Sequence, residues 1–589
     1  MTVKEKLAAL RAEMKKNNID AFIVFSADPH MSEYLPEAWQ EREWLSGFTG
    51  SYGFVVVTKD KAGLWTDGRY FTQAKEQLQG TEITMFKDKV IDAVDYVEWI
   101  ISVTSKNAKI AVNALATSHA SWTDLKTKLE KNKRQLINKP LLNEVWKDRA
   151  SEGMNPVFVQ PISRAGESVL DKLARIREKM KEENASVHIV SSLDDVAWTL
   201  NLRGSDVECN PVFLSYLLIT PEKAILFVKT EKLNEEAISL MQESNVQTQE
   251  YESFFPHLKT LKQEKIWLSN NTNQAVFEAV EDQNEIMVAP VPGNLMKAVK
   301  NKTELKGFET VMLKDGVAMV NFLYWLTDRV GKEKMTEYSV SRKLLEFRQQ
   351  QENFVGVSFE TIVGYKGNGA IIHYAPPSKG SAEIRAEGSV LIDSGGQYLE
   401  GTTDLTRTLP LGEITKEFKK DYTTTLKAYI NLAMAKFPKG TRGEQLDVLA
   451  RLPLWKEGKD FMHGTGHGVG SFLNVHEGPQ SIRKEHNPFS LQPGMVLSNE
   501  PGYYITGKYG IRHENLMSVK EFKETEWNDF YEFETLTYCP FFKEPIIKEM
   551  LTCEEIQWLN DYHKTCEKKL SHLLEGQVKD WFFEMVAPI

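Results

Sequence analysis

The first twenty residues carry apolar positions at the spacing of an amphipathic helix. Leu7, Leu10 and Met14 lie three and four residues apart among lysine and glutamate, so a helix would place all three on one face. The apolar stretch AFIV follows at residues 21–24 and indicates a short buried strand. A secretory signal peptide would instead have a continuous apolar core, so this segment is predicted to be part of the fold.

The same helix and strand pattern recurs later in the chain. Residues 6–24, KLAALRAEMKKNNIDAFIV, align without gaps on residues 172–190, KLARIREKMKEENASVHIV. After an insertion in the first copy, TKDKAGLWT from Thr58 corresponds to TPEKAILFV from Thr220. Each copy reads as helix, strand, helix or loop, strand, turn and strand. We therefore predict two similar α/β domains in the first half of the chain.

Two segments rich in proline and glycine divide the chain. One lies around Pro161, and the other, APVPGN, precedes a long predicted helix at whose start Asn301 and Glu304 have the spacing of a capping box. A chain of 589 residues is long enough for three or four domains at about 150 residues each. The predicted domains are residues 1–160, 161–296 and 297–589, an α/β and α+β protein whose chemistry lies in the third domain.

Composition and charge narrow the classes of function. With 41% hydrophobic and 26% charged residues, the chain resembles ordinary globular proteins. The net charge of −10 argues against nucleic acid or an anionic membrane as a main partner, because both require a basic face. No apolar run approaches the roughly 18 residues of a membrane span. The four cysteines show no CxxC spacing, which is typical of reduced thiols in a cytoplasmic protein.

A glycine-containing hairpin is predicted in VLIDSGGQYLEGTTDLTRTL. If its turn centres between Tyr398 and Leu399, Asp393 and Asp404 become direct cross-strand neighbours on one face. Two carboxylates so close repel each other unless a cation or a proton lies between them. The alternative is a pair of surface aspartates on a loop.

A second hairpin follows in NEPGYYITGKYGIRHEN. With Gly507 at the turn, Glu500 and Glu514 lie opposite each other, and Arg512 shares the face of Glu514 by strand alternation. Two hairpins that each pair two acids form a stronger pattern than either alone.

Histidines accompany these acids. In HGTGHGVGSF, glycine occupies every second position, which disfavours a helix and favours extended backbone close to a site. His463 and His467 are then on the same side, with His476 a short distance further and His373 shortly before the first hairpin. A single histidine is more often a core or surface residue than a ligand, but four near the acidic motifs favour a functional role.

The donor set predicts a metal centre. Four carboxylates and one imidazole suit Mn²⁺, or a similar ion such as Co²⁺ or Zn²⁺, and the absence of thiolate argues against a structural zinc. Five ligands exceed the needs of one ion, so a two-metal site is predicted. Signatures of serine or cysteine hydrolases, P-loop proteins and HExxH peptidases are missing. The predicted ligands are Asp393, Asp404, His467, Glu500 and Glu514.

The motifs resemble those of a known family. DSGGQYLEGTTDLTRT, HGTGHGVGSFLNVHEGP, NEPGYY and GIRHEN are similar to the motifs of the pita-bread metallopeptidases, and most closely to the three-domain Xaa-Pro aminopeptidases (aminopeptidase P). EREWLSGFTGS and LWTDGRYF in the first domain fit the three-domain form. The resemblance spans nearly the whole chain and implies a pita-bread fold for the third domain.

The resemblance also implies roles for individual residues. Asp404 and Glu514 would bridge the two metal ions, and Glu500 would in addition carry a proton from the attacking water to the leaving nitrogen. Arg512 would orient the carboxylate of Glu514 or Asp404, and Arg69 would contact substrate from the first domain. The histidines expected to bind substrate and stabilise the tetrahedral intermediate are His373, His463 and His476.

The implied activity is hydrolysis of the bond between an N-terminal residue and a proline at position two of an oligopeptide, by a cytoplasmic homodimer with two divalent metal ions. The main alternative is a prolidase restricted to Xaa-Pro dipeptides, against which the duplicated N-terminal domain argues. A non-catalytic peptide-binding or histone-binding protein of the same fold would have lost its ligands, and a creatinase-like amidinohydrolase lacks the full set.

Overall fold

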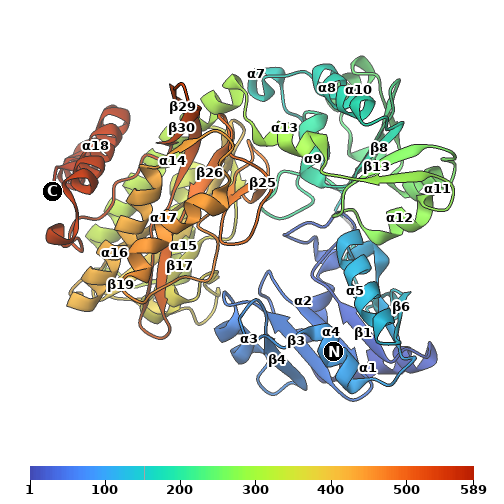
Figure 1. The fold of residues 1–589 in the computed structure, drawn as a ribbon. Coiled ribbons are helices and arrows are strands. Elements are labelled where there is room, and N and C mark those ends of the chain that lie inside the picture. Colours follow the sequence, from blue (N-terminus) through green and yellow to red (C-terminus); the bar gives the residue numbers. More distant parts are fainter. Residues whose placement is uncertain (152) are drawn as a thin grey trace. The chain divides into compact units, whose positions relative to one another are not determined.

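The computed structural model describes residues 1–151 and 153–589. By their internal contacts they form two compact units, an N-terminal unit of Met1–Gln160 with Glu167–Gly293 and a C-terminal unit of Pro161–Gly166 with Asn294–Ile589. Figure 1 shows the elements of each unit as a ribbon. None of the helices formed by the described residues is both long and apolar enough to cross a membrane.

The N-terminal unit contains two six-stranded sheets of the same topology. In each sheet the strand after the first helix lies in the centre, antiparallel to one neighbour and parallel to the other. The prediction of two similar α/β domains is therefore confirmed. The first sheet has the order β4 (Ile83–Lys87), β3 (Ala62–Thr66), β2 (Phe54–Thr58), β1 (Ala21–Val24), β5 (Lys109–Val112) and β6 (Gln135–Asn138); the second has the order β12 (Val246–Gln249), β11 (Ala224–Phe227), β10 (Tyr216–Ile219), β8 (Val187–Val190), β13 (Lys265–Leu268) and β14 (Glu285–Val288).

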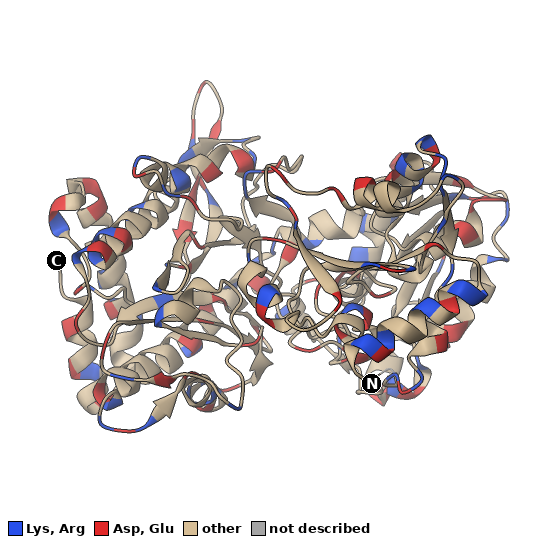
Figure 2. Ribbon diagram, turned by 90° about the horizontal axis from the view of Figure 1, so that it is seen from below, with Lys and Arg blue, Asp and Glu red and all other residues tan. Residues whose placement is uncertain are grey.

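The helix before each central strand explains why the repeat folds in this way. Helix α1 (Val3–Lys16) buries Leu7, Leu10 and Met14, as the spacing predicts. Helix α8 (Val169–Glu182) buries the aligned residues, among them Leu173. Each helix covers its sheet with one apolar face and turns most of its lysines and glutamates to water, although Lys172 of α8 is buried. Figure 2 shows Lys and Arg interspersed with Asp and Glu along the helices of the protein.

The long helix of the C-terminal unit is α14 (Lys302–Arg329), which follows α7 (Ile162–Ala165) and α13 (Pro292–Ala298) along the chain. It is capped as predicted by Asn301 and Glu304. Further helices cover the strands: α15 (Glu337–Gln349) contacts β17 and α17 (Gly443–Trp455) contacts β25. The strands and the remaining long helix are β16 (Phe354–Val357), β20 (Gly396–Tyr398) and β21 (Gly401–Thr402) in one sheet; β17 (Ile362–Tyr365), β19 (Ser389–Ser394) and β22 (Leu405–Pro410) in a second; β23 (Lys436–Pro438), β30 (Asp529–Thr535), β29 (Asn515–Glu524), β26 (Val496–Asn499), β24 (Gly466–Gly468) and β25 (Glu477–Ile482) in a third; the hairpin of β27 (Gly502–Ile505) and β28 (Tyr509–Arg512); and α16 (Lys416–Ala433).

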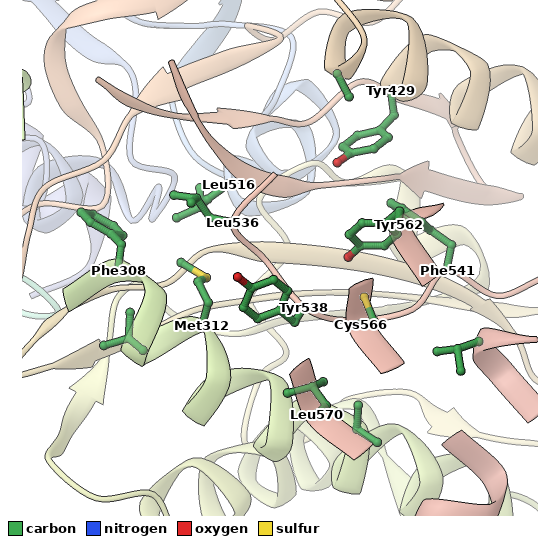
Figure 3. Close-up of a cluster of buried hydrophobic side chains, with 14 of the residues drawn as sticks. Phe308, Met312, Tyr429, Leu516, Leu536, Tyr538, Phe541, Tyr562, Cys566 and Leu570 are labelled. Atoms are coloured by element: carbon green, nitrogen blue, oxygen red, sulfur yellow. The ribbon is translucent and has the colours of Figure 1, made fainter. Parts of the chain in front are cut away.

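The C-terminal tail completes the core of this unit. Helix α18 (Cys553–Leu570) and helix α19 (Gly576–Val586) contact α14. Figure 3 shows Phe308 and Met312 of α14 in the same cluster as Cys566 and Leu570 of α18. The C-terminal tail therefore packs on the long helix of its own chain.

Candidate metal centre

The five predicted ligands lie on strands or directly beside them. Each follows or precedes a run of buried residues, so the sheets hold the donors and leave little freedom to their backbone. Asp393 lies on β19, Asp404 just before β22, His467 on β24, Glu500 just after β26, and Glu514 between β28 and β29.

The register of the first hairpin differs from the prediction. Asp393 lies opposite Thr406, not opposite Asp404, because Tyr398 pairs with Gly401 and the turn is centred one residue later than expected. A shift of two positions along the partner strand preserves the side-chain face. The predicted direct pairing of Asp393 with Asp404 was wrong.

The register of the second hairpin is as predicted. Gly502 pairs with Arg512 and Asn499 pairs with Asn515. Both pairs belong to the same register, and in that register Glu500 lies opposite Glu514. Gly507 at the turn has a φ of +76°, in the left-handed region that glycine adopts without strain.

Three of the predicted ligands form a compact donor group. One oxygen each of Asp404 and Glu514 and one nitrogen of His467 lie within 4.8 Å of one another. The Nε2 atom of His467 is 3.4 Å from Asp404 Oδ2 and 3.4 Å from Glu500 Oε1. Its Nδ1 atom is 2.9 Å from the carbonyl oxygen of Gly468, to which it donates its proton. Since Nδ1 carries this proton, Nε2 is the nitrogen turned towards the carboxylates, and it can bind a metal ion once it has lost its own proton.

The electrostatics of the group fit divalent cations. Burial, together with the neighbouring charge of Asp404, raises the pKa of Glu514 well above its usual range. Burial likewise raises the pKa of Asp393 and of Glu500. Burial lowers the pKa of His467, but its contacts with Asp404 and Glu500 outweigh this effect and raise the pKa to about 9. Ionised carboxylates at this spacing need a positive charge between them.

One carboxylate oxygen among the five predicted ligands also lacks a hydrogen bond. Asp393 Oδ1 is buried without a hydrogen-bond partner among the described residues. A buried carboxylate oxygen without a partner is costly, and a coordinated cation would satisfy it. The residues present therefore fit a site for divalent metal ions.

A network of hydrogen bonds fixes the carboxylates from behind. Arg512 donates from Nη2 to Asp393 Oδ2 at 2.5 Å and from Nε to Thr406 Oγ1 at 3.2 Å. Thr406 in turn donates to Glu514 Oε2 at 2.5 Å. Arg512 thus contacts Asp393 directly and reaches Glu514 through Thr406.

Two members of this network were missed by the sequence analysis, Thr406 and Tyr504. Tyr504 accepts a hydrogen bond from Arg512 Nη1 at 2.6 Å and lies 2.8 Å from His463 Nε2. Strand alternation could have indicated Thr406, which is an even number of residues from Asp404 and so shares its face. Tyr504 gave no comparable signal, because its partners lie on other segments.

The predicted histidines lie around the donor group. His463 Nδ1 is 3.9 Å from Glu500 Oε2, and the ring of His476 packs edge-on against that of His467 at 4.4 Å between centroids. His373 follows Ile372, whose carbonyl oxygen accepts a hydrogen bond from Arg512 at 3.4 Å. Arg69 lies in the N-terminal unit, where it pairs with Asp67 through two hydrogen bonds of 3.0 Å.

Comparison with protein families covers most of the chain. Residues 6–145 and 148–304 each match the Creatinase/Prolidase N-terminal domain. Residues 308–521 match metallopeptidase family M24, and residues 529–589 match the C-terminal region of that peptidase family.

Individual relatives extend over the full length. Xaa-Pro aminopeptidase 1 of Dictyostelium discoideum is 40% identical over 100% of this chain and 97% of its own. The crystal structure of X-prolyl aminopeptidase from Caenorhabditis elegans, described as a cytosolic enzyme with a di-nuclear active site, is 35% identical with a TM-score of 0.96 and covers 100% of both chains.

A prolidase matches a smaller part of the chain. The recombinant prolidase from Thermococcus sibiricus covers 64% of this chain and 98% of its own, at 23% identity and a TM-score of 0.51, a likeness of fold alone. The relatives that align over the full length and the order of the matched domains along the chain point to the same family. The chain belongs to the Xaa-Pro aminopeptidase family, with an M24 metallopeptidase domain in its C-terminal unit.

Proposed function

We propose that this protein is a dinuclear metal-dependent aminopeptidase that hydrolyses the bond between an N-terminal residue and a proline at position two of an oligopeptide. The observation that carries the proposal is the donor group of Asp404, His467 and Glu514, whose two carboxylates are buried, in a chain that aligns with Xaa-Pro aminopeptidases over its whole length.

The five predicted ligands would hold two divalent metal ions. Four carboxylates favour hard cations, so we propose Mn²⁺ as the metal, with Co²⁺ or Zn²⁺ as alternatives. Such ions lower the pKa of water, which supplies a nucleophile at neutral pH, and they polarise a carbonyl group.

The chain's own residues prepare this chemistry. Arg512 and Thr406 hold the carboxylates of Asp393 and Glu514 in fixed orientations, so the donors need no rearrangement when substrate arrives. Glu500, whose pKa is raised by burial, would accept the proton of the attacking water and return it to the proline nitrogen. The leaving amine needs that proton, because an unprotonated amide nitrogen is a poor leaving group.

The histidines are proposed to contact substrate and to stabilise the oxyanion of the tetrahedral intermediate; they are His373, His463 and His476. His463 Nδ1 lies 2.7 Å from the carbonyl oxygen of its neighbour Gly464, so this nitrogen carries the proton. Its Nε2 lies 2.8 Å from the hydroxyl of Tyr504, so substrate must displace one of these two contacts before His463 can donate to an oxyanion. The proline nitrogen carries no N–H and its ring fixes φ, so peptidases that bind that N–H cannot cleave the bond before proline. A site that binds the neighbouring carbonyl oxygen instead accepts this bond.

The function is tested with protein stripped of metal by a chelator and reloaded with Mn²⁺, Co²⁺ or Zn²⁺. We expect the reloaded protein to release arginine from a peptide beginning Arg-Pro-Pro and to leave a matched Arg-Ala-Pro peptide intact, with highest activity in Mn²⁺. Liquid chromatography with mass spectrometry measures the products. Cleavage of Xaa-Pro dipeptides alone would indicate a prolidase, and no metal uptake with no cleavage would indicate a peptide-binding protein.

Arg69 is proposed to contact substrate from the N-terminal unit. Its guanidinium is held by Asp67 and lies 5.7 Å from the ring centroid of Tyr52. The proposal fails if Arg69→Ala leaves KM for oligopeptides unchanged. We also place the enzyme in the cytoplasm, as described for the relative from Caenorhabditis elegans; recovery of the protein from another cell fraction would contradict this.

The homodimer is a further proposal, supported by one face of α17. Val448, Leu452 and Trp455 lie at helical spacing and are 39%, 43% and 44% exposed, an apolar stripe that a second copy could cover. We expect Leu452→Asp to convert the dimer into a monomer, because it places a charge in the centre of the stripe. Light scattering after size-exclusion chromatography measures the mass, and Lys456→Asp just beyond the helix is the control. A wild-type monomer would refute the proposal.

A further inference from the structure

A fully buried ion pair lies beside the metal centre, between Lys300 and Glu477. Both side chains are 0% exposed. We infer that Lys300 is a positioning residue, which acts through Glu477 to hold His467 and His476 in the geometry that catalysis needs. This inference rests on the proposed function for its kinetic part, whereas its spectroscopic part depends only on metal binding.

Glu477 connects the ion pair to both histidines. It is the first residue of β25 and pairs with Gly468, the residue after His467. It also directly follows His476, whose ring packs on that of His467. A displacement of Glu477 would therefore move both imidazoles.

The strand pairing at this point is irregular and does not fix the geometry by itself. His467 pairs with Ser481 whereas Gly468 pairs with Glu477, so three residues of β25 are looped out between the two pairs. Such a bulge interrupts the ladder and re-aims the neighbouring side chains. The Glu477 carboxylate lies against the glycine-rich strand, since a Cβ atom added at Gly470 would be 3.1 Å from its Oε2 atom. A side-chain anchor is needed here because the backbone ladder is broken.

Lys300 provides a rigid anchor. Its backbone N–H donates to the carbonyl oxygen of Gly494 at 3.0 Å, and its Nζ donates to the carbonyl oxygen of Lys297 at 2.9 Å as well as to Glu477. The next residue, Asn301, caps α14 and donates from Nδ2 to Ala165 at 2.8 Å. The ammonium group is thus fixed to the sheet and to the start of the long helix.

A purely structural role is the alternative reading. Buried ion pairs often add little stability compared with apolar residues of the same size, and breaking one by removing a single partner is more harmful than replacing both. A structural pair and a positioning pair therefore differ in the double variant. Replacing both partners restores the stability in either case, but it restores the geometry of His467 and His476 only if the pair has no positioning role.

The experiment compares Lys300→Met, Glu477→Leu and the double variant, each loaded with Co²⁺. We expect the single variants to melt several degrees lower and the double variant to recover most of that loss. We expect kcat to stay about 10–100-fold lower in all three, the range found when groups that orient metal ligands are removed, with a smaller change in KM. The visible absorption of bound Co²⁺ should shift in all three, because His467 is one of the proposed ligands.

A matched control is the buried pair of Lys232 and Asp206 in the N-terminal unit, whose side chains are 1% and 0% exposed. Lys232→Met should lower the melting temperature similarly and leave the Co²⁺ spectrum unchanged. A double variant with wild-type kcat and a wild-type Co²⁺ spectrum would overturn the inference. If the parent protein binds Co²⁺ but cleaves no Xaa-Pro peptide, the proposed function fails, and the spectra still decide the positioning role.

Discussion

Replacing Asp404 by asparagine is expected to lower kcat/KM for an Arg-Pro-Pro peptide by about 1,000-fold, equivalent to about 4 kcal/mol of transition-state stabilisation. Asp404 belongs to the compact donor group with His467 and Glu514, and an amide is a weaker metal ligand than a carboxylate. The variant should bind less than the full complement of metal. Steady-state kinetics and elemental analysis of the purified protein measure the two effects.

The same variant should fold normally. Asp404 is among the charges that raise the pKa of Glu514 and of Asp393, so its neutralisation relieves repulsion in the metal-free protein. We therefore expect the melting temperature without metal to be unchanged or higher. Asp328→Asn, on the surface of α14 and paired with Lys332, is the control and should keep full activity. Wild-type kcat/KM in Asp404→Asn would refute the proposed centre.

Replacing Arg407 by methionine is expected to destabilise the C-terminal unit by about 3–5 kcal/mol, because several buried acceptors lose their donor and each unsatisfied group costs about 1–3 kcal/mol. Arg407 is 0% exposed, and its guanidinium lies 4.2 Å from the ring centroid of Phe541. Methionine fills a similar volume but donates no hydrogen bond. The acceptors left without this donor are the carbonyl oxygens of Thr406, Glu514, Cys539 and Pro540 and the side chains of Asn515 and Tyr562.

Differential scanning calorimetry measures this effect, since a protein with two units need not unfold in one step. Arg329→Met is the matched control, because Arg329 is half-exposed at the end of α14 and pairs with Asp328 and Glu333. Surface substitutions of this kind change stability by about 0.5 kcal/mol or less. Equal melting temperatures for the two variants would show that the Arg407 network contributes little to stability.

The N-terminal half of the fold follows from local sequence pattern. The spacing of Leu7, Leu10 and Met14 predicts the buried face of α1, and the gapless repeat predicts a second domain with the same strand order. Helical and strand periodicities are properties of consecutive residues, so a single sequence contains them.

Hairpin registers depend on both local and distant contacts. Gly507 fixes the second hairpin, because its positive φ marks the turn. The first hairpin has three glycines near its turn, and no one of them determines its centre. There the backbone of Gly395 is packed tightly, since an added Cβ would lie 2.0 Å from Thr403 O and 2.1 Å from Ser358 Oγ. Contacts with another strand therefore decide a register that the turn residues leave open.

The sequence by itself determined the types of donor at the proposed metal centre and the segments that carry them. Only the tertiary structure decided how these donors are held. Thr406 and Glu514 are 108 residues apart, and Lys300 and Glu477 are 177 residues apart. Such pairs have no periodic signature, because their partners meet only when separate strands and helices pack into one unit. Local motifs thus specify the residue types of the site, whereas the packing of the whole C-terminal unit specifies its geometry.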